Sequence, residues 1–234
     1  VPSPMFNMIN GGKHGAGNLD FQEFFIIPSH LHSFASSLET GAVIYKNMKK
    51  LLSRRGAIHS VGDEGGFAPN LFTNLDALEV LVEASTESNR KVGVDVELGL
   101  DLAANSFFKD GRYTIKDRSS PLETVEFIDY LKDLNEQYHL RILEDPLHED
   151  DWRGWSILTS TLGGQTSVVG DDLLVTNPQR VKKAIAEKAC NAILVKPNQI
   201  GTISETIAVI HQSRAAGWKI IVSHRSGETN DDFI

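Results

Sequence analysis

Residues 191–196 read NAILVK, a short apolar run that ends in a lysine. The same design recurs along the chain: VELGLD ends at Asp101, LRILE at Glu144, SVVGD at Asp171 and KIIVSH at His224. Successive end residues are 43, 27, 25 and 28 positions apart, which is room for one strand, one helix and two short loops. A β/α barrel places the carboxyl ends of its strands around one mouth. We therefore predict an α/β barrel in which three carboxylates, a lysine and a histidine converge.

Composition limits the class of protein and its partners. The chain has 234 residues, 41% of them hydrophobic, and a net charge of -8. This length suits a single α/β domain, and the acidic balance argues against nucleic acid and anionic membranes as partners. No apolar run is long enough to span a membrane. The single cysteine, Cys190, excludes an intrachain disulfide and indicates a reducing compartment, so we expect a cytoplasmic protein.

The order of the apolar patterns predicts two strands, then two helices, then regular alternation. Apolar residues at helical spacing predict helices over residues 33–52 and 76–84. A proline-containing cap at Ser120–Glu123, Asn177 before Pro178, and a capping box at Thr202–Glu205 predict the starts of later helices. We expect seven strands, near Phe6, Phe24, Val96, Ile142, Val169, Leu194 and Ile221. A closed barrel has eight strands, so the last one is expected to follow Ile234.

Three acidic residues at strand ends suggest a metal site. Asp101, Glu144 and Asp171 are hard oxygen donors in successive βα units, and Mg²⁺ favours carboxylates together with water and substrate oxygens. Each acid alone could equally be a helix N-cap, and the neighbouring Asp145 and Asp172 could exchange roles with Glu144 and Asp171. Because three such residues recur, metal binding is the preferred interpretation.

Two further segments carry candidates for proton transfer and anion binding. Lys196 ends an apolar run, and because burial and a nearby cation both lower the pKa of a lysine, it could act as a general base. The loop Gly62–Gly66 presents Glu64 between glycines, where it could act as a general acid. The loop Ser223–Glu228 offers a histidine, an arginine and two hydroxyls that suit a phosphate or carboxylate. Each candidate has an alternative interpretation. Lys196 could be a strand-end lysine that extends to water, Gly62–Gly66 a solvated turn, and Ser223–Glu228 a plain polar loop.

Taken together, the loops of this chain resemble those of the enolase (phosphopyruvate hydratase) family. The stretches that carry the resemblance follow the family order over the whole chain and are NGGKH at 10–14, QEF at 22–24, VGDEGGFAPN at 61–70, GLD at 99–101, EDP at 144–146, GDDL at 170–173, KPNQIGT at 196–202 and SHRSGET at 223–229. The resemblance implies a C-terminal barrel domain over residues 1–234, with the order ββαα(βα)6 but without its last strand. It also implies an N-terminal α+β domain that lies outside these residues.

The resemblance further implies an activity and a role for each matching residue. The activity is the interconversion of 2-phosphoglycerate with phosphoenolpyruvate and water in glycolysis and gluconeogenesis, with Mg²⁺ as cofactor and a homodimer for the full-length protein. Lys196 matches the base that removes the proton alpha to the carboxylate, and Glu64 the acid that assists loss of the 3-hydroxyl. The metal ligands are Asp101, Glu144 and Asp171, and the substrate-binding residues are His14, Glu23, Glu144, Asp171, Lys196, Ser223, His224, Arg225 and Ser226.

Two other functions stay open at this point. One is a different metal-dependent lyase or epimerase of the same superfamily, which would share the metal triad but not this set of loops. The other is an inactive enolase-derived fragment that acts as a binding or structural module. The family's closing serine loop and its second lysine, both expected outside residues 1–234, favour that alternative for this segment taken alone. The intact Lys196, Glu64 and acidic triad favour an enzyme.

Overall fold

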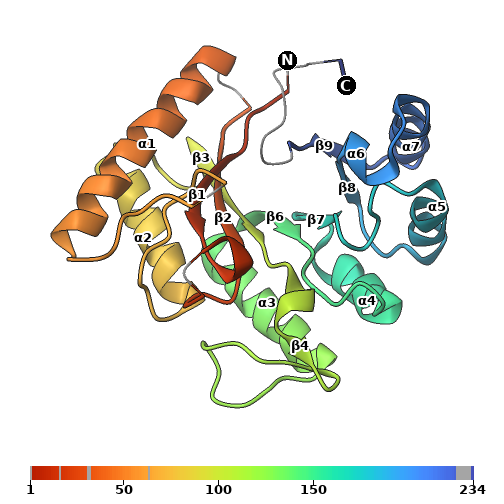
Figure 1. Cartoon of the computed structure of the whole chain (residues 1–234), viewed down its shortest axis with the longest axis horizontal. Helices are drawn as coiled ribbons and strands as arrows, with labels where there is room; N and C mark the ends of the chain where they lie inside the picture. Colours follow the sequence, from red (N-terminus) through yellow and green to blue (C-terminus); the bar gives the residue numbers. More distant parts are fainter. Residues whose placement is uncertain (1, 16, 31–32, 63, 225–232) are drawn as a thin grey trace. The chain divides into compact units, whose positions relative to one another are not determined.

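The computed structural model describes residues 2–15, 17–30, 33–62, 64–224 and 233–234 (Figure 1). The chain divides into two compact units, Val1–Arg141 and Ile142–Ile234. In sequence, the main elements follow the predicted order of two strands, two helices and then alternating strands and helices. All seven predicted strands are present, and two more form a small separate hairpin that the sequence did not predict.

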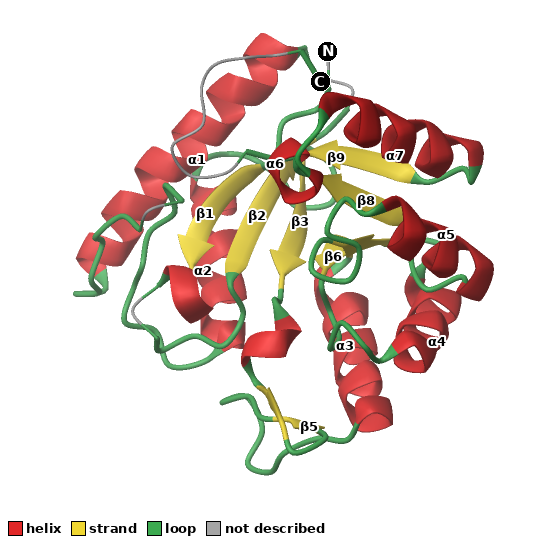
Figure 2. Ribbon diagram, turned by 45° about the vertical axis from the view of Figure 1, so that its right-hand side comes forward, coloured by secondary structure: helices red, strands yellow, loops and turns green. Residues whose placement is uncertain are grey.

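The first unit is built on three antiparallel strands, β1 (Phe6–Asn10), β2 (Glu23–Pro28) and β3 (Val96–Asp101). Between β1 and β2 lies the short 3₁₀ turn Gly12–His14. Helices α1 (Phe34–Arg54) and α2 (Asn74–Glu87) pack against each other and against β2 (Figures 1 and 2). The register pairs Glu23 with Asp101, so these two acidic residues stand side by side at one end of the sheet.

Helices α1 and α2 form where the apolar spacing predicted them. Ile44, Met48 and Leu51 line the buried stripe of α1, and the Ser33 side chain caps its start by accepting from the Ser36 N–H at 3.2 Å. Thr73 and Asp76 form a reciprocal capping box at the start of α2. These caps satisfy backbone N–H groups that a helix leaves without partners at its first turn.

The predicted start of the next helix was wrong. Helix α3 (Thr124–Tyr138) begins after Glu123, and the predicted first-turn proline, Pro121, lies outside it. Leu122 instead exchanges two 2.8 Å backbone hydrogen bonds with Tyr113, which extends the hairpin of β4 (Phe108–Lys109) and β5 (Arg112–Tyr113). The Tyr113 ring stacks on Phe127 with centroids 4.4 Å apart. This pairing and stacking override the local capping signal, because a cap contributes only about 1 kcal/mol.

The second unit contains parallel strands with helices between them. Strands β6 (Leu140–Glu144, which begins just before the boundary), β7 (Ser167–Gly170), β8 (Ala192–Val195) and β9 (Lys219–Val222) pair in sequence order. The intervening helices are α4 (Trp152–Leu162), α5 (Pro178–Glu187), the single turn α6 (Pro197–Ile200) and α7 (Ile203–Ala215) (Figure 2). Every residue of β7 and β8 is buried, as expected for parallel strands covered on both faces.

The predicted caps of α5 and α7 are present, with one difference in detail. Asn177 accepts from the N–H groups of Gln179 and Arg180, and Pro178 occupies the first turn of α5. Thr202 accepts from the Glu205 N–H at 3.2 Å, but Glu205 takes its hydrogen bond from the Thr202 hydroxyl rather than from the Thr202 backbone. Gly217 follows α7 with φ +75°, as a glycine after a helix commonly does.

None of the helices in the described part of the chain is both long and apolar enough to cross a membrane.

Asn191 ties the amino ends of β7 and β8 together. Its Oδ1 accepts from the Val168 N–H at 2.8 Å, and its Nδ2 donates to the carbonyls of Gly163 and Thr166 at 2.9 and 3.1 Å. Asn191→Leu removes all three bonds beside the buried Thr166 and Val168. We expect it to lower the free energy of unfolding by roughly 2–4 kcal/mol.

Urea denaturation of the intact protein measures this loss. Gln179→Leu on the exposed face of α5 is the matched control, and we expect it to change stability by less than about 0.5 kcal/mol. Equal stabilities for the two variants would show that the Asn191 bonds contribute nothing to the fold.

Candidate active site

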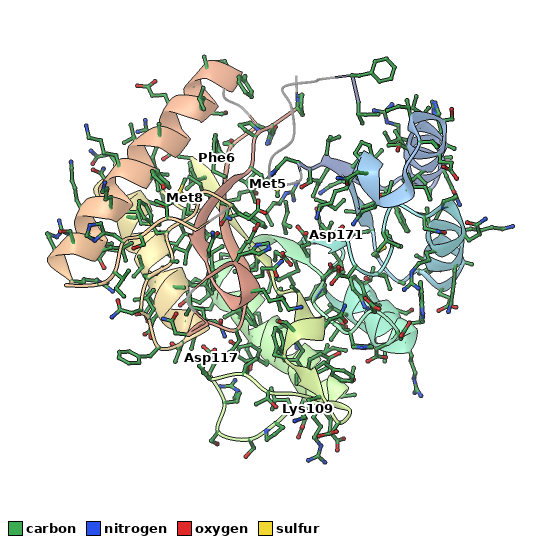
Figure 3. The ribbon with its side chains drawn as sticks, viewed as in Figure 1. Met5, Phe6, Met8, Lys109, Asp117 and Asp171 are labelled. Atoms are coloured by element: carbon green, nitrogen blue, oxygen red, sulfur yellow. The ribbon has the colours of Figure 1, made fainter. Side chains whose placement is uncertain are left out.

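Lys196 and Asp171 form a close ion pair in the second unit. Asp171 follows the last residue of β7 and Lys196 follows the last residue of β8, so both stand at the carboxyl ends of adjacent parallel strands; Asp171 is labelled in Figure 3. Lys196 Nζ lies 2.5 Å from Asp171 Oδ2, and the two side chains are 17% and 11% exposed. The ends of the two apolar runs therefore lie in contact, and the lysine amine is largely shielded from water.

Asp145 uses its carboxylate to hold the turn that follows β7. Its Oδ1 accepts from the Asp171 N–H at 3.0 Å and its Oδ2 from the Asp172 N–H at 2.7 Å, with a longer contact from the Leu173 N–H at 3.5 Å. Asp145 is 4% exposed and has φ +40°, a conformation that aspartate tolerates better than most residues. The sequence left the roles of Glu144 and Asp145 open, and this geometry makes Asp145 the residue that binds backbone.

The acidic residues of the second unit have the chemistry of a hard-cation site. Glu144, Asp145 and Asp171 are 4%, 4% and 8% exposed, and Asp145, Asp171 and Asp172 each offer an oxygen within 4.8 Å of the others. Carboxylates are seldom buried together without positive charge, and Lys196 supplies one such charge in contact with Asp171. All the donors are oxygens, which suits Mg²⁺ or a similar divalent ion rather than zinc. The residues present therefore fit a divalent metal.

His14 and Glu23 form the central polar pair of the first unit. His14 Nδ1 lies 2.9 Å from Glu23 Oε1, with side chains 33% and 15% exposed. The hydrogen bond with Glu23 raises the pKa of His14 above its ordinary value of 6.5, partial burial opposes that shift, and the charges of Glu64 and Asp101 add to it. These four predicted residues therefore lie close enough to interact, and the three carboxylates favour a protonated imidazole.

The loop that carries Glu64 is held by aromatic and backbone contacts. Tyr45 donates its hydroxyl to the Gly65 carbonyl at 2.9 Å, and its ring stacks on Phe67 with centroids 4.4 Å apart. The Asn10 N–H donates to the Phe67 carbonyl at 2.7 Å. A Cβ at Gly66 would lie 2.6 Å from Asn10 Oδ1, so the loop can pack this closely only with glycine there. Glu64 is thus carried on a loop that is anchored directly after it, at Gly65 and Phe67.

Asp101 closes β3 as the predicted acidic residue. It is 5% exposed, and its carboxylate accepts from Gln22 Nε2 and from the Ala103 N–H, both at 2.9 Å. Hydrogen bonds of this kind fix the orientation of a carboxylate. The structure therefore gives Asp101 a set orientation within its own unit.

The predicted substrate loop after β9 is described only in part. The Ser223 N–H donates to the Val195 carbonyl at 3.1 Å, which continues the β8–β9 pairing, and the Ser223 hydroxyl donates to the His224 carbonyl at 3.1 Å. His224 is exposed. Arg225 and Ser226 lie outside the described residues.

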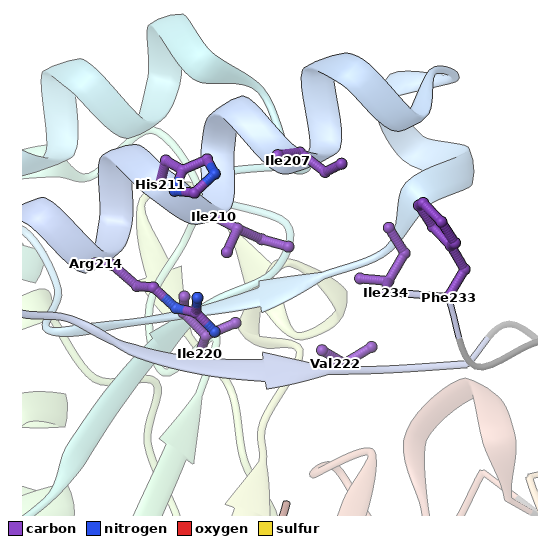
Figure 4. Close-up of a pocket in the computed structure, with 8 residues that line it drawn as sticks. All are labelled: Ile207, Ile210, His211, Arg214, Ile220, Val222, Phe233 and Ile234. Atoms are coloured by element: carbon purple, nitrogen blue, oxygen red, sulfur yellow. The ribbon is translucent and has the colours of Figure 1, made fainter.

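A pocket of about 190 Å³ lies between α7 and β9 and is lined by apolar side chains together with His211 and Arg214 (Figure 4). Ile207 and Ile210 of α7 face Ile220 and Val222 of β9, and Phe233 lies at one end. It contains none of the residues that the sequence singled out for chemistry, so we do not assign it to the site.

Comparison with known protein families gives a match over the whole chain. The family described as "Enolase, C-terminal TIM barrel domain" matches residues 1–234. The chain belongs to this family. The resemblance drawn from the loops is therefore confirmed at the level of the enolase superfamily, and so is the predicted α/β fold of the TIM-barrel type. An enolase barrel domain carries out lyase or epimerase chemistry of the enolase kind, and such domains typically use a divalent metal.

Sequence reasoning missed three residues that support the site. Tyr45 anchors the Glu64 loop, and Thr176 and Gln199 contact Lys196 and Asp171 through hydrogen bonds. Only Gln199 carried a usable signal, because it follows Lys196 by three positions within a proline-started turn. Tyr45 and Thr176 depend on contacts between segments far apart in sequence, which no local pattern reveals.

The His14–Glu23 pair predicts a pH dependence in the first unit. Because the folded-state pKa of His14 is raised, the pair stabilises the fold fully below the unfolded pKa of about 6.5, and this contribution is lost as pH rises through the folded pKa. In Glu23→Gln we expect the His14 pKa to fall, and its stability deficit relative to wild type to shrink as pH rises.

An NMR titration of the His14 ring, together with denaturation at several pH values, measures both effects. Glu39→Gln on the exposed face of α1 is the control, because Glu39 is not among the carboxylates that raise the His14 pKa. An unchanged His14 titration in Glu23→Gln would remove Glu23 as the cause.

Proposed function

We propose that this enolase barrel domain is the catalytic domain of a phosphopyruvate hydratase, which interconverts 2-phospho-D-glycerate with phosphoenolpyruvate and water. The observation that carries the proposal is the Lys196–Asp171 contact of 2.5 Å at the ends of adjacent parallel strands. A shielded amine held beside a carboxylate is suited to act as a base once a substrate or metal competes for that carboxylate. The loop motifs at residues 61–70 and 196–202 support enolase over other members of the superfamily.

In the proposed reaction, Lys196 Nζ takes the proton from C2 of 2-phosphoglycerate. The electron pair of that C–H bond stays on the substrate and is delocalised into its carboxylate. Glu64 then donates a proton to the 3-hydroxyl, which leaves as water while the same electron pair forms the C2–C3 double bond. The substrate thus loses one hydrogen from C2 and one hydroxyl from C3, and phosphoenolpyruvate remains.

A divalent metal would supply the positive charge that this chemistry needs. A proton alpha to a carboxylate is very weakly acidic, and Mg²⁺ near that carboxylate would offset the charge that develops there. We propose Asp101, Glu144 and Asp171 as its ligands. Burial of all three side chains and the all-oxygen donor chemistry support this assignment.

The remaining predicted residues are proposed to bind the substrate. His14, whose raised pKa favours the cation, is proposed to contact the phosphate and the 3-hydroxyl region together with Glu23. Ser223, His224, Arg225 and Ser226 are proposed to hold the substrate, with Arg225 and Ser226 at the phosphate. We also propose a cytoplasmic role in glycolysis and gluconeogenesis and a homodimer for the full-length protein.

Separate assays of the two half-reactions test these roles. In the intact protein, Lys196→Ala should abolish exchange of the C2 hydrogen with solvent, because no base remains to remove it. Glu64→Gln should retain exchange but lose phosphoenolpyruvate formation, because the acid acts after the C–H bond breaks. Exchange is followed by NMR in D₂O and product by ultraviolet absorbance.

Lys219→Ala is the control for Lys196, since Lys219 lies at the amino end of β9 and donates to Ser167 Oγ at 3.0 Å. It should leave both rates unchanged. Wild-type exchange in Lys196→Ala would refute the base assignment. Exchange without any dehydration by the wild-type protein would instead indicate an epimerase of the same superfamily.

A further inference from the structure

Thr176 and Gln199 connect the two members of the Lys196–Asp171 pair through a closed set of hydrogen bonds. The Lys196 backbone N–H donates to Thr176 Oγ1 at 3.0 Å, and the Thr176 hydroxyl donates to Gln199 Oε1 at 2.7 Å. Gln199 Nε2 then donates to Asp171 Oδ1 at 2.8 Å, and Lys196 Nζ contacts Asp171 Oδ2 at 2.5 Å. We call the Thr176–Gln199 pair the hydroxyl–amide bridge.

The backbone around Thr176 adopts a conformation that needs support from its surroundings. Val175 and Thr176 have φ +43° and +51°, which is unfavourable for β-branched residues. Thr176 is completely buried, and its side chain both accepts and donates a hydrogen bond. Strained backbone of this kind persists where the surrounding structure over-determines it, and it is concentrated at functional sites.

Gln199 is placed by the short turn that follows the lysine. Pro197 begins α6 directly after Lys196, the Gln199 N–H donates to the Lys196 carbonyl at 3.0 Å, and the Gly201 N–H donates to the Pro197 carbonyl at 2.9 Å. The side-chain amide therefore reaches Asp171 from a backbone that is itself anchored to Lys196. Any movement of the lysine backbone would move the amide with it.

We propose that Thr176 and Gln199 are positioning residues that hold the Lys196 amine and the Asp171 carboxylate in one geometry for proton transfer. The inference rests on the proposed function, in which Lys196 is the base. With the amide on Oδ1 and the amine on Oδ2, rotation of the carboxylate would break a bond. A lysine side chain is long and flexible, so fixing its backbone and its carboxylate partner limits the arrangements that its amine samples. Reaction rates depend steeply on such placement.

The bridge also defines how Asp171 would present itself to a metal. Carboxylates that ligate metals are commonly hydrogen-bonded by neighbouring groups, and loss of these partners typically costs about 10–100-fold in metal affinity or activity. Gln199 is such a neighbour for Asp171. Its loss should therefore weaken Mg²⁺ binding even when no substrate is present.

The test compares three variants of the intact protein with a matched control. Thr176→Val and Gln199→Met remove the bridge with little change in volume, and Thr176→Ser restores the hydroxyl. Thr159→Val is the control, because it removes a hydroxyl that donates to the Ala189 carbonyl at 2.7 Å elsewhere in the same unit. Measurements are C2-hydrogen exchange of 2-phosphoglycerate with its kcat and KM, Mg²⁺ affinity by calorimetry without substrate, and thermal unfolding.

We expect Thr176→Val and Gln199→Met to lower kcat for exchange by about 10–100-fold, with KM nearly unchanged. Thr176→Ser should recover exchange. Gln199→Met should also weaken Mg²⁺ binding, while Thr159→Val alters neither property. A purely structural role would instead lower the unfolding temperature and leave kcat and Mg²⁺ affinity of the folded protein intact, which would overturn the proposal.

The bridge and the proposed function can fail separately. If the wild-type protein exchanges the C2 hydrogen and both bridge variants exchange it equally fast, the positioning role of the bridge is refuted and the proposed function is retained. If the wild-type protein does not act on 2-phosphoglycerate, the proposed function fails, and unchanged Mg²⁺ affinity in Gln199→Met would overturn the bridge independently. Gln199 lies on a partly exposed turn. The Gln199→Met variant therefore tests the positioning role even when Thr176→Val does not fold.

Discussion

The arrangement of the second unit depends on the carboxylate of Asp145 binding the backbone that follows β7. The N–H groups of Asp171 and Asp172 turn away from the sheet there, and Asp145 accepts both at 3.0 and 2.7 Å. Asp171 is 8% exposed, so its N–H has little access to water, and Asp172 is partly buried. An unsatisfied buried N–H costs about 1–3 kcal/mol. Asp145 therefore stabilises the turn and sets the direction in which the Asp171 side chain leaves it.

The position of Asp171 then determines the position of its partners. Its two oxygens contact Lys196 Nζ and Gln199 Nε2, and Thr176 joins Gln199 to the Lys196 backbone. Each of these side chains is thus fixed by a hydrogen bond to a neighbour that is also hydrogen-bonded. The first member of this chain of hydrogen bonds is Asp145, which directly follows β6. Supporting shells of this kind keep reactive groups within a fraction of an ångström of a productive geometry.

Buried carboxylates have different partners in the two units. In the second unit, carboxylates are balanced by Lys196 and by backbone N–H groups, which leaves the site suited to a further cation. In the first unit, Glu23 faces the imidazole of His14 and raises its pKa. That arrangement favours a cationic histidine.

The strand ends could be predicted because the buried strands of this chain are short apolar runs with a polar residue at the carboxyl end. Asp101, Glu144, Asp171 and Lys196 all end or directly follow such strands. The start of α3 could not be predicted, because its cap signal competed with hydrogen bonds from Leu122 to Tyr113.

The support of the site was also hidden in the sequence. Glu144 and Asp145 are adjacent acids, and only the fold shows that Asp145 binds the amides after β7. Thr176 lies 20 residues from Lys196, and its left-handed backbone is imposed by tertiary contacts rather than by local preference. Local patterns therefore reveal the residues that end the strands, and tertiary hydrogen bonds decide what each of them does.

Amide hydrogen exchange at residues 171–173 tests the central role of Asp145 most directly. Asp145→Asn keeps a residue that tolerates the left-handed conformation, but it replaces one acceptor oxygen with a donor. Both amides can then no longer be satisfied. We predict slow exchange of the Asp171 and Asp172 amides in the wild-type protein and markedly faster exchange in Asp145→Asn, with the interior of α5 unchanged. Equally slow exchange of these two amides in both proteins would contradict the account.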